Sequence, residues 1–156
     1  MSLSDLRPMT SSPSELAPVP FTEVNIPSDT AEARRVQEAI EGDLRKGLAT
    51  DQEVFSVRLA LEEALVNAIK HGNQMDRAKS VQVSYRFLND RFEVLITDEG
   101  AGFDPNDVPD PTAIENLERP CGRGLMLMRH YMSEVQYNDR GNRVHMVKVF
   151  KCNGKK

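Results

Sequence analysis

The sequence predicts a single α+β domain, a two-layer sandwich in which helices cover one face of a mainly antiparallel sheet. Two pairs of segments alternate apolar and polar residues, a pattern that is typical of hairpins with one buried face. Two long segments repeat apolar residues at helical spacing. The predicted elements do not alternate strand with helix along the 156 residues, which disfavours the parallel sheet of a βαβ fold.

The folded domain is expected to span residues 21–151. Residues 1–20 hold four of the nine prolines and show no apolar periodicity, so a flexible tail is expected there. A docking or phosphorylation segment is the alternative for that tail. Residues 152–156 are expected to form a short basic tail.

A short strand and a helix are expected first. Residues 21–26 place apolar side chains at intervals that suit a strand. Ser28 or Asp29 can then cap a helix over Ala31–Gly47, because a side-chain oxygen at the cap accepts a free backbone amide. Gly47 suits the end of that helix.

The longest predicted helix is Asp51–His71. Thr50 and Glu53 form a capping-box pattern at its start, and Gly72-Asn73 ends it. Its core face is expected to consist of Val54, Val57, Leu61, Leu65 and Ala68.

A polar stripe runs along this helix at about 100° from the core face. It consists of Glu63, Asn67 and His71 and is edged by two alanines, whereas Glu62 points to solvent. A carboxylate can act as a general base, and an amide oxygen is a hard ligand that suits Mg²⁺. A solvated helix flank is the alternative.

Two hairpins and a helix are expected in the second half. The first hairpin joins Val81–Tyr85 and Phe92–Ile96 around Asn89-Asp90, and the second joins Val135–Tyr137 and Val144–Phe150 around Arg140-Gly141. Between the hairpins we expect a loop over 98–122, one helical turn at Thr112–Leu117, and a helix over Gly124–Met132.

Two glycine-containing motifs border this loop. Asp98 follows a strand and precedes Gly100 and Gly102, which places an acceptor beside a backbone that can approach a ligand closely. An ordinary turn is the alternative.

The second motif, Arg119-Pro-Cys-Gly-Arg-Gly124, leads into the predicted helix. Free amides at a helix start bind anions, and Arg119 and Arg123 add cationic donors for phosphate. A flexible loop is the alternative. We expect Leu125, which follows, to belong to the core or to a helix-packing surface.

Charge and composition exclude several classes of protein. The chain carries 20 basic and 24 acidic residues, a formal net charge of −4, which argues against direct nucleic-acid binding through a basic face. No apolar run approaches the roughly 20 residues of a membrane span, and no secretory signal is visible. Cys121 and Cys152 have no metal-ligand spacing and are expected to be free thiols. A cytoplasmic protein without membrane contact is therefore expected.

The three motifs together, Glu63-x3-Asn67-x3-His71, Asp98-x-Gly100-x-Gly102 and Gly122-x-Gly124, occur in a specific order. This order resembles the N, G1 and G2 boxes of the Bergerat-fold (GHKL) ATPases, the superfamily of gyrase, Hsp90, MutL and histidine-kinase ATP domains. The phrase LEEALVNAIKHGN looks most like the small anti-sigma-factor serine/threonine kinases of bacteria. The resemblance covers roughly residues 21–150.

The resemblance implies a role for each matching residue. Glu63 matches the catalytic glutamate, Asn67 the Mg²⁺ ligand, and Asp98 the acceptor for the adenine amino group. The remaining matches are His71 near the phosphates, Gly100 and Gly102 beside the base, Gly122, Arg123, Gly124 and Leu125 in the phosphate-holding turn, and Arg119 near a catalytic lid arginine. Many relatives carry a threonine near the adenine in the last strand, where His145 or a neighbour stands here.

The resemblance also implies a function. An anti-sigma factor of this kind uses ATP and Mg²⁺, binds a sigma factor, and phosphorylates a serine on an antagonist protein, usually as a homodimer. The alternatives are a non-catalytic ATP-binding partner-switching regulator, the detached ATP domain of a two-component histidine kinase, and an unrelated binding protein of the same fold.

Overall fold

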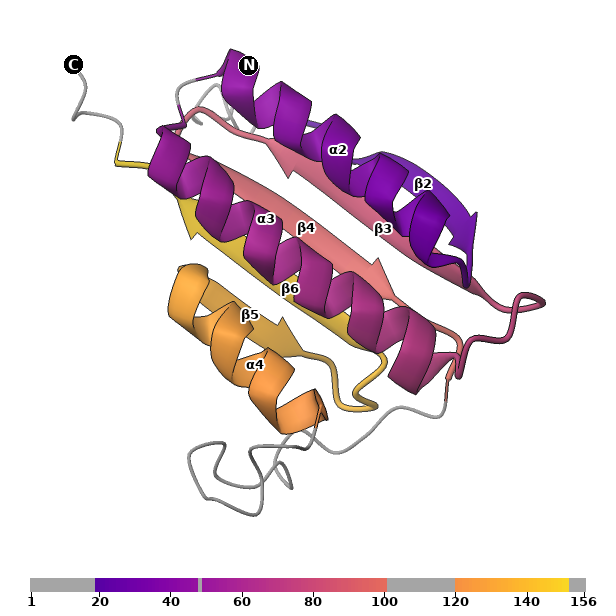
Figure 1. Cartoon of the computed structure of the whole chain (residues 1–156). Helices are drawn as coiled ribbons and strands as arrows, with labels where there is room; N and C mark the ends of the chain where they lie inside the picture. Colours follow the sequence, from indigo (N-terminus) through magenta and orange to yellow (C-terminus); the bar gives the residue numbers. More distant parts are fainter. Residues whose placement is uncertain (1–18, 48, 101–119, 152–156) are drawn as a thin grey trace, which may run out of the picture.

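The computed structural model describes residues 19–47, 49–100 and 120–151, which form two layers (Figure 1). The described strands make one antiparallel sheet in the order β2-β3-β4-β6-β5. Their bounds are Thr22–Pro27 for β2, Ser80–Phe87 for β3, Arg91–Thr97 for β4, Glu134–Tyr137 for β5 and Arg143–Val149 for β6.

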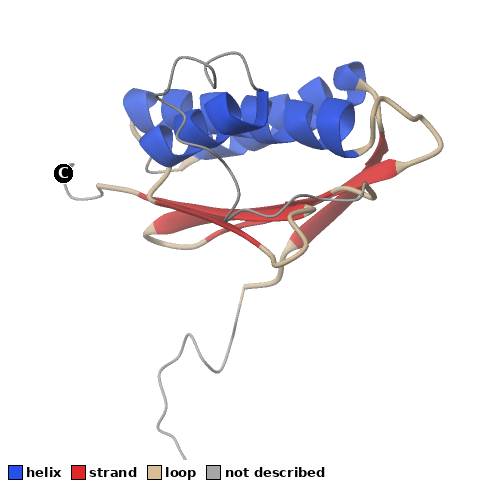
Figure 2. Cartoon of the chain, turned by 90° about the horizontal axis from the view of Figure 1, so that it is seen from below, coloured by secondary structure: helices blue, strands red, loops and turns tan. Residues whose placement is uncertain are grey.

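The helices lie together on one face of this sheet, as Figure 2 shows. They are α2 (Thr30–Lys46), α3 (Asp51–Val66) with its continuation η2 (Asn67–Gly72), and α4 (Pro120–Tyr131). Helix α3 lies between α2 and α4 (Figure 1) and packs against both. The predicted α+β fold and both predicted hairpins are therefore confirmed.

Local sequence signals explain where the first two helices begin. Asp29 caps α2, since its Oδ1 accepts from the Ala31 amide at 2.9 Å. Thr50 and Glu53 form the predicted capping box, with each side chain accepting from the other residue's amide. Glu53 also accepts from the Lys151 amide at 2.7 Å, which ties the start of α3 to the end of the last strand.

The core lies between the sheet and the helices. The five residues predicted for the core face of α3 are at most 5% exposed. They pack against the inward side chains of the sheet, of which Val81, Val83, Phe92, Val94 and Met146 are fully buried. Ala60 and Ala64, the two alanines that edge the polar stripe, are also buried.

One predicted helix changes type in its last turn, and one predicted helix bound is wrong. The helix that begins at Asp51 widens into a π-helical turn over Asn67–Gly72 instead of continuing as an α-helix to His71. Helix α4 begins at Pro120 rather than at Gly124, because proline fits the first helical position, where its missing amide is not needed. None of the helices in the described parts of the chain is long and apolar enough to cross a membrane.

Candidate functional site

The stripe on α3 faces the beginning of α4. Glu63 and Asn67 are half-buried, and the backbone of Gly124 lies directly beside both side chains. A Cβ atom at Gly124 would lie 2.7 Å from Nδ2 of Asn67 and 3.1 Å from Oε1 of Glu63. The ends of both side chains would have to turn aside for any larger residue. Two predicted motifs that are far apart in sequence therefore meet here.

His71 does not share this position. The π-helical turn is marked by the hydrogen bond from the Asn73 amide to the Ala68 carbonyl at 2.8 Å, five residues back. A π-helical turn has more residues per turn than an α-helix, so the α-helical spacing that placed His71 on the stripe does not hold there, and its side chain is exposed. The contact of His71 with phosphates stays a prediction that this structure does not support.

The end of η2 touches the turn that follows β4. A Cβ atom at Gly72 would overlap the carboxyl group of Asp98, and one at Gly100 would overlap the Gly72 carbonyl. The predicted first glycine motif and the end of the N-box helix are therefore in backbone contact. Asp98 is half-buried at this junction.

Hydrogen bonds hold Asp98 from both sides. Its Oδ1 accepts from the Gly100 amide at 2.8 Å, and its amide and carbonyl pair with the Asn142 carbonyl and side-chain amide at 2.9 and 3.1 Å. Burial raises the pKa of Asp98 above its ordinary value, against the lowering effects of the Gly100 amide, Arg140 and Lys79. Among the described residues only the Gly100 amide donates to this carboxylate, through Oδ1, so Oδ2 is the candidate acceptor for a ligand.

Asn73 is a residue of this site that sequence reasoning assigned only to the helix end. Its side chain is fully buried and joins three segments. Nδ2 donates to Ser28 Oγ and to the Ser80 carbonyl, both at 3.0 Å, and Oδ1 accepts from the Glu99 amide at 2.8 Å. No periodicity marks it, because its burial arises only when those three segments meet.

Several predicted residues fall partly or wholly outside the described residues. Gly102 and Arg119 lie outside them, as does the helical turn expected at Thr112–Leu117. The backbone at Gly122 and Arg123 belongs to the first turns of α4, whose leading amides lack an intrahelical acceptor. The side chain of Leu125 is 4% exposed and packs in the core, so only its backbone is available to a ligand.

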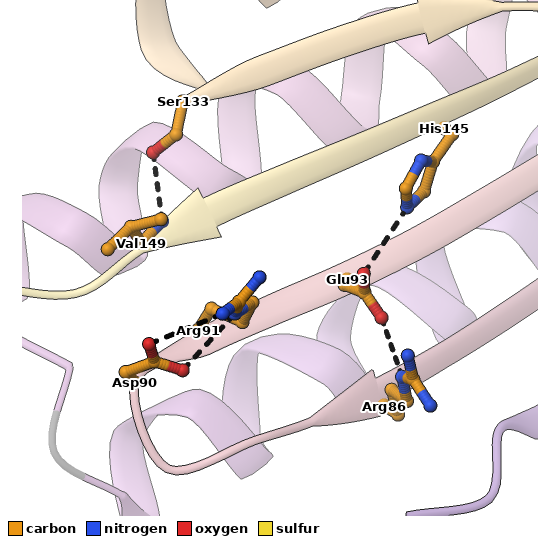
Figure 3. A network of polar contacts seen from close by, with 7 residues as sticks. All are labelled: Arg86, Asp90, Arg91, Glu93, Ser133, His145 and Val149. Carbon is orange, nitrogen blue, oxygen red and sulfur yellow. Dashed lines mark hydrogen bonds and ion pairs between the residues drawn. The ribbon is translucent and has the colours of Figure 1, made fainter. Parts of the chain in front are cut away.

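His145 lies on the opposite face of the sheet from the helices. Its Nε2 is 3.5 Å from Oε2 of Glu93, whose Oε1 accepts from Nε of Arg86 at 2.6 Å (Figure 3). The family resemblance placed His145 or a neighbour near the adenine, and the structure favours a neighbour, because strand residues alternate between faces. Its neighbours Val144 and Met146 are the ones that face the helix layer.

The described residues contain no group of three or more His, Cys, Asp and Glu side chains that could hold a metal. A Mg²⁺ ion at Asn67 would therefore need further oxygen ligands from a bound phosphate and from water, which is the usual way that proteins hold Mg²⁺. The chemistry available at the site is one carboxylate and one amide beside the start of α4, and a second carboxylate beside the end of η2.

Comparisons with known proteins agree on one family. Residues 26–148 match the model of the histidine kinase-like ATPase domain. Two proteins named serine-protein kinase RsbW, from Staphylococcus aureus strains RF122 and MRSA252, are each 25% identical over 139 residues, which cover 84% of this chain and 87% of theirs.

A solved structure shares the fold. The crystal structure of the RsbU and RsbW domains of Rv1364c from Mycobacterium tuberculosis aligns with a TM-score of 0.57 and 16% identity. The alignment covers 86% of this chain but only 33% of that longer chain. At this identity the likeness concerns the fold alone.

Proposed function

Since the chain belongs to the histidine kinase-like ATPase domain family, we propose that it is an ATP- and Mg²⁺-dependent serine/threonine protein kinase of the anti-sigma type. The resemblance to the Bergerat-fold ATPases is confirmed by that membership, and the named relatives are serine-protein kinases. The observation that carries the proposal is the close approach of Gly124 to Glu63 and Asn67, which joins two nucleotide-binding motifs at one place.

The residues present suit a magnesium nucleotide. The side-chain oxygen of Asn67 is a hard ligand of the kind that Mg²⁺ accepts. The leading amides of α4, Gly122 among them, are donors for phosphate oxygens at the positive end of the helix dipole. Asp98 offers an acceptor for the adenine amino group, beside Gly100, where the backbone alone occupies the space.

The proposed roles rest on this chemistry together with the family resemblance. Asn67 would hold Mg²⁺, and bound Mg²⁺ supplies charge neutralisation at the phosphates. Glu63 would take the proton of the serine hydroxyl as that oxygen bonds to the γ-phosphorus and ADP leaves. We carry over the roles of Arg119 at the terminal phosphate, and of His71, Gly102, Arg123 and Leu125 around the nucleotide, from the family resemblance.

The partners follow from the same resemblance. We propose that the chain binds a sigma factor in one state and phosphorylates a serine of an anti-sigma antagonist in another, as a homodimer in the cytoplasm. No direct contact with nucleic acid or membrane is included in this proposal.

Nucleotide binding is the first test. ATP should raise the midpoint of thermal unfolding of the parent chain, and more so with Mg²⁺, because a ligand that binds the native state stabilises it. Asn67→Ala should lose the Mg²⁺-dependent part of that increase. An Asn67→Ala protein that binds Mg-ATP as tightly as the parent would show that the metal assignment is wrong.

Phosphate transfer is the second test. With labelled ATP and a candidate antagonist, label should appear on a serine of the antagonist. Glu63→Gln should abolish transfer while ATP binding remains, whereas Glu62→Gln should leave transfer unchanged, because Glu62 is exposed and Glu63 faces α4. Binding without transfer in the parent would instead identify a non-catalytic partner-switching regulator, and acid-labile phosphate on a partner would indicate a histidine-kinase domain.

A further inference from the structure

The side chain of Asn73 joins three separate segments through hydrogen bonds. Both donors of its amide group are used, one on the Ser28 hydroxyl at the end of β2 and one on the Ser80 carbonyl at the start of β3. Its oxygen accepts from the Glu99 amide in the turn after β4. The side chain is 0% exposed, so water cannot replace these partners.

The Glu99 contact fixes the neighbouring carboxylate. Asp98 precedes Glu99, and its carboxyl group fills the space that a side chain at Gly72 would need. Gly72 and Asn73 are consecutive at the helix end, and Asp98 and Glu99 are consecutive in the turn. Gly72 contacts Asp98, and Asn73 binds Glu99. The Glu99 carboxylate adds a further link, since its Oε2 accepts from the amide and hydroxyl of Ser80 at 2.8 and 2.7 Å.

Asp98 is also held from the side of β6, by Asn142. The hydrogen bond between Asn73 and Glu99 differs from the Asn142 contacts because it joins the turn to a helix and not to a strand. Asn73 lies at the end of the same continuous helix that carries Glu63 and Asn67. It therefore links the part of the site assigned to the metal and phosphates with the part assigned to the base.

We propose that Asn73 is a positioning residue that holds the Asp98–Gly100 turn against the end of η2 and thereby sets the preference of the site for adenine. The inference rests on the proposed function, in which Asp98 accepts the adenine amino group. Without the Asn73 oxygen, the Glu99 amide loses its partner and the turn loses its hydrogen bond to the helix end. The packing of Gly72 against Asp98 and Gly100 then remains, and it fixes the position of Asp98 relative to Asn67 less tightly.

The test compares two variants that disturb the same hydrogen-bond cluster. Asn73→Ala removes the contact with Glu99. Ser28→Ala removes a partner of Nδ2 and the hydrogen bond from Ser28 Oγ to the Lys79 carbonyl, but it leaves the Glu99 contact intact. The ratio of the Kd values for Mg-GTP and Mg-ATP is measured for each by calorimetry. We expect this ratio to fall about tenfold in Asn73→Ala, as the loss of one well-placed hydrogen bond to a charged group implies, and to stay at the parent value in Ser28→Ala.

The outcomes distinguish failure of the proposed function from failure of the proposed role of Asn73. A parent chain that does not bind ATP, or does not prefer ATP to GTP, contradicts the proposed function. A parent that prefers ATP and an Asn73→Ala variant that keeps the whole preference overturn the role of Asn73 alone. A ratio that falls equally in Ser28→Ala would also overturn it, because the effect would then follow stability and not the Glu99 contact.

A second variant covers the case in which Asn73→Ala does not fold. Asn73→Asp keeps an oxygen for the Glu99 amide and loses the donors to Ser28 and Ser80, so it should be less stable yet retain the adenine preference. Loss of the preference in this variant would contradict the proposal. In the parent chain, hydrogen exchange of the Glu99 amide should be slow without nucleotide, and exchange at the rate of an open loop would overturn the proposal without any variant.

Discussion

Alanine at Gly124 should weaken both the fold and the nucleotide site, and a matched variant isolates the reason. The new Cβ would lie 2.7 Å from Nδ2 of Asn67 and 3.1 Å from Oε1 of Glu63, so Asn67 or α4 must shift. Overpacking of this kind costs about 1–3 kcal/mol. The alanine also gains about 1 kcal/mol of helix propensity over glycine.

Gly42 supplies the control, because it lies inside α2 and a Cβ atom there would meet nothing within 4 Å. Gly42→Ala should therefore show the propensity gain alone, about 1 kcal/mol, or an increase of about 2–4 °C in the midpoint of thermal unfolding. The difference between the two variants then equals the packing cost at Gly124, about 1–3 kcal/mol.

Urea unfolding gives the free energies, and calorimetric titration gives the affinity for Mg-ATP. We expect Gly124→Ala to bind Mg-ATP less tightly than the parent, because the displaced groups are Asn67 and Glu63, whereas Gly42→Ala should bind as the parent does. Equal stability of the two variants, together with equal affinity, would refute the close packing of α4 against the stripe and with it the assembled site.

Three further predictions concern single groups. Thr50→Ala removes one side of the capping box and should lower the free energy of unfolding by about 1 kcal/mol, measured in urea. Burial of Glu53 acts to raise its pKa, but hydrogen bonds from Thr50 and Lys151 lower the pKa overall. The contribution of Glu53 to stability is therefore present above its unfolded pKa and is lost as the pH falls through its folded pKa. The free energies of unfolding of the parent and of Glu53→Gln, measured in urea between pH 3 and 7, should converge at the acid end. Burial raises the pKa of Asp98, so ionisation of Asp98 opposes folding as the pH rises through that pKa. Asp98→Asn should therefore be at least as stable as the parent at pH 7 and yet bind ATP more weakly. A variant that loses both stability and ATP affinity would contradict this account.

Much of the fold could be predicted because its signals are local. Alternation along β3 and β4 fixed which side chains face the helices, and the capping box at Thr50 fixed where α3 begins. The helical wheel separated Glu63 from Glu62 correctly, since α3 is a regular α-helix up to Val66. Each of these signals depends on residues that are close in sequence.

The errors lie where distant segments meet. The π-helical turn at Asn67–Gly72 ends in contact with Asp98. Asn73, the next residue, accepts a hydrogen bond from the Glu99 amide, 26 residues away. The end of this helix therefore packs against a turn that is distant in sequence. Spacing on a regular α-helix placed His71 on the stripe, and the π-helical turn breaks that spacing. The family resemblance placed His145 or a neighbour near the base, and the structure puts His145 on the face of the sheet away from the helices.

Hydrophobic periodicity and capping act over a few residues, so the amino-acid sequence was enough to predict the hairpins, the helix caps and the three motifs that mark a nucleotide-binding family. The approach of Gly124 to Asn67 and the burial of Asn73 among β2, β3 and the turn after β4 depend on how distant segments pack. Such contacts form when separate elements pack, and they select glycine or a fully bonded amide through the space and the hydrogen-bond partners that remain there.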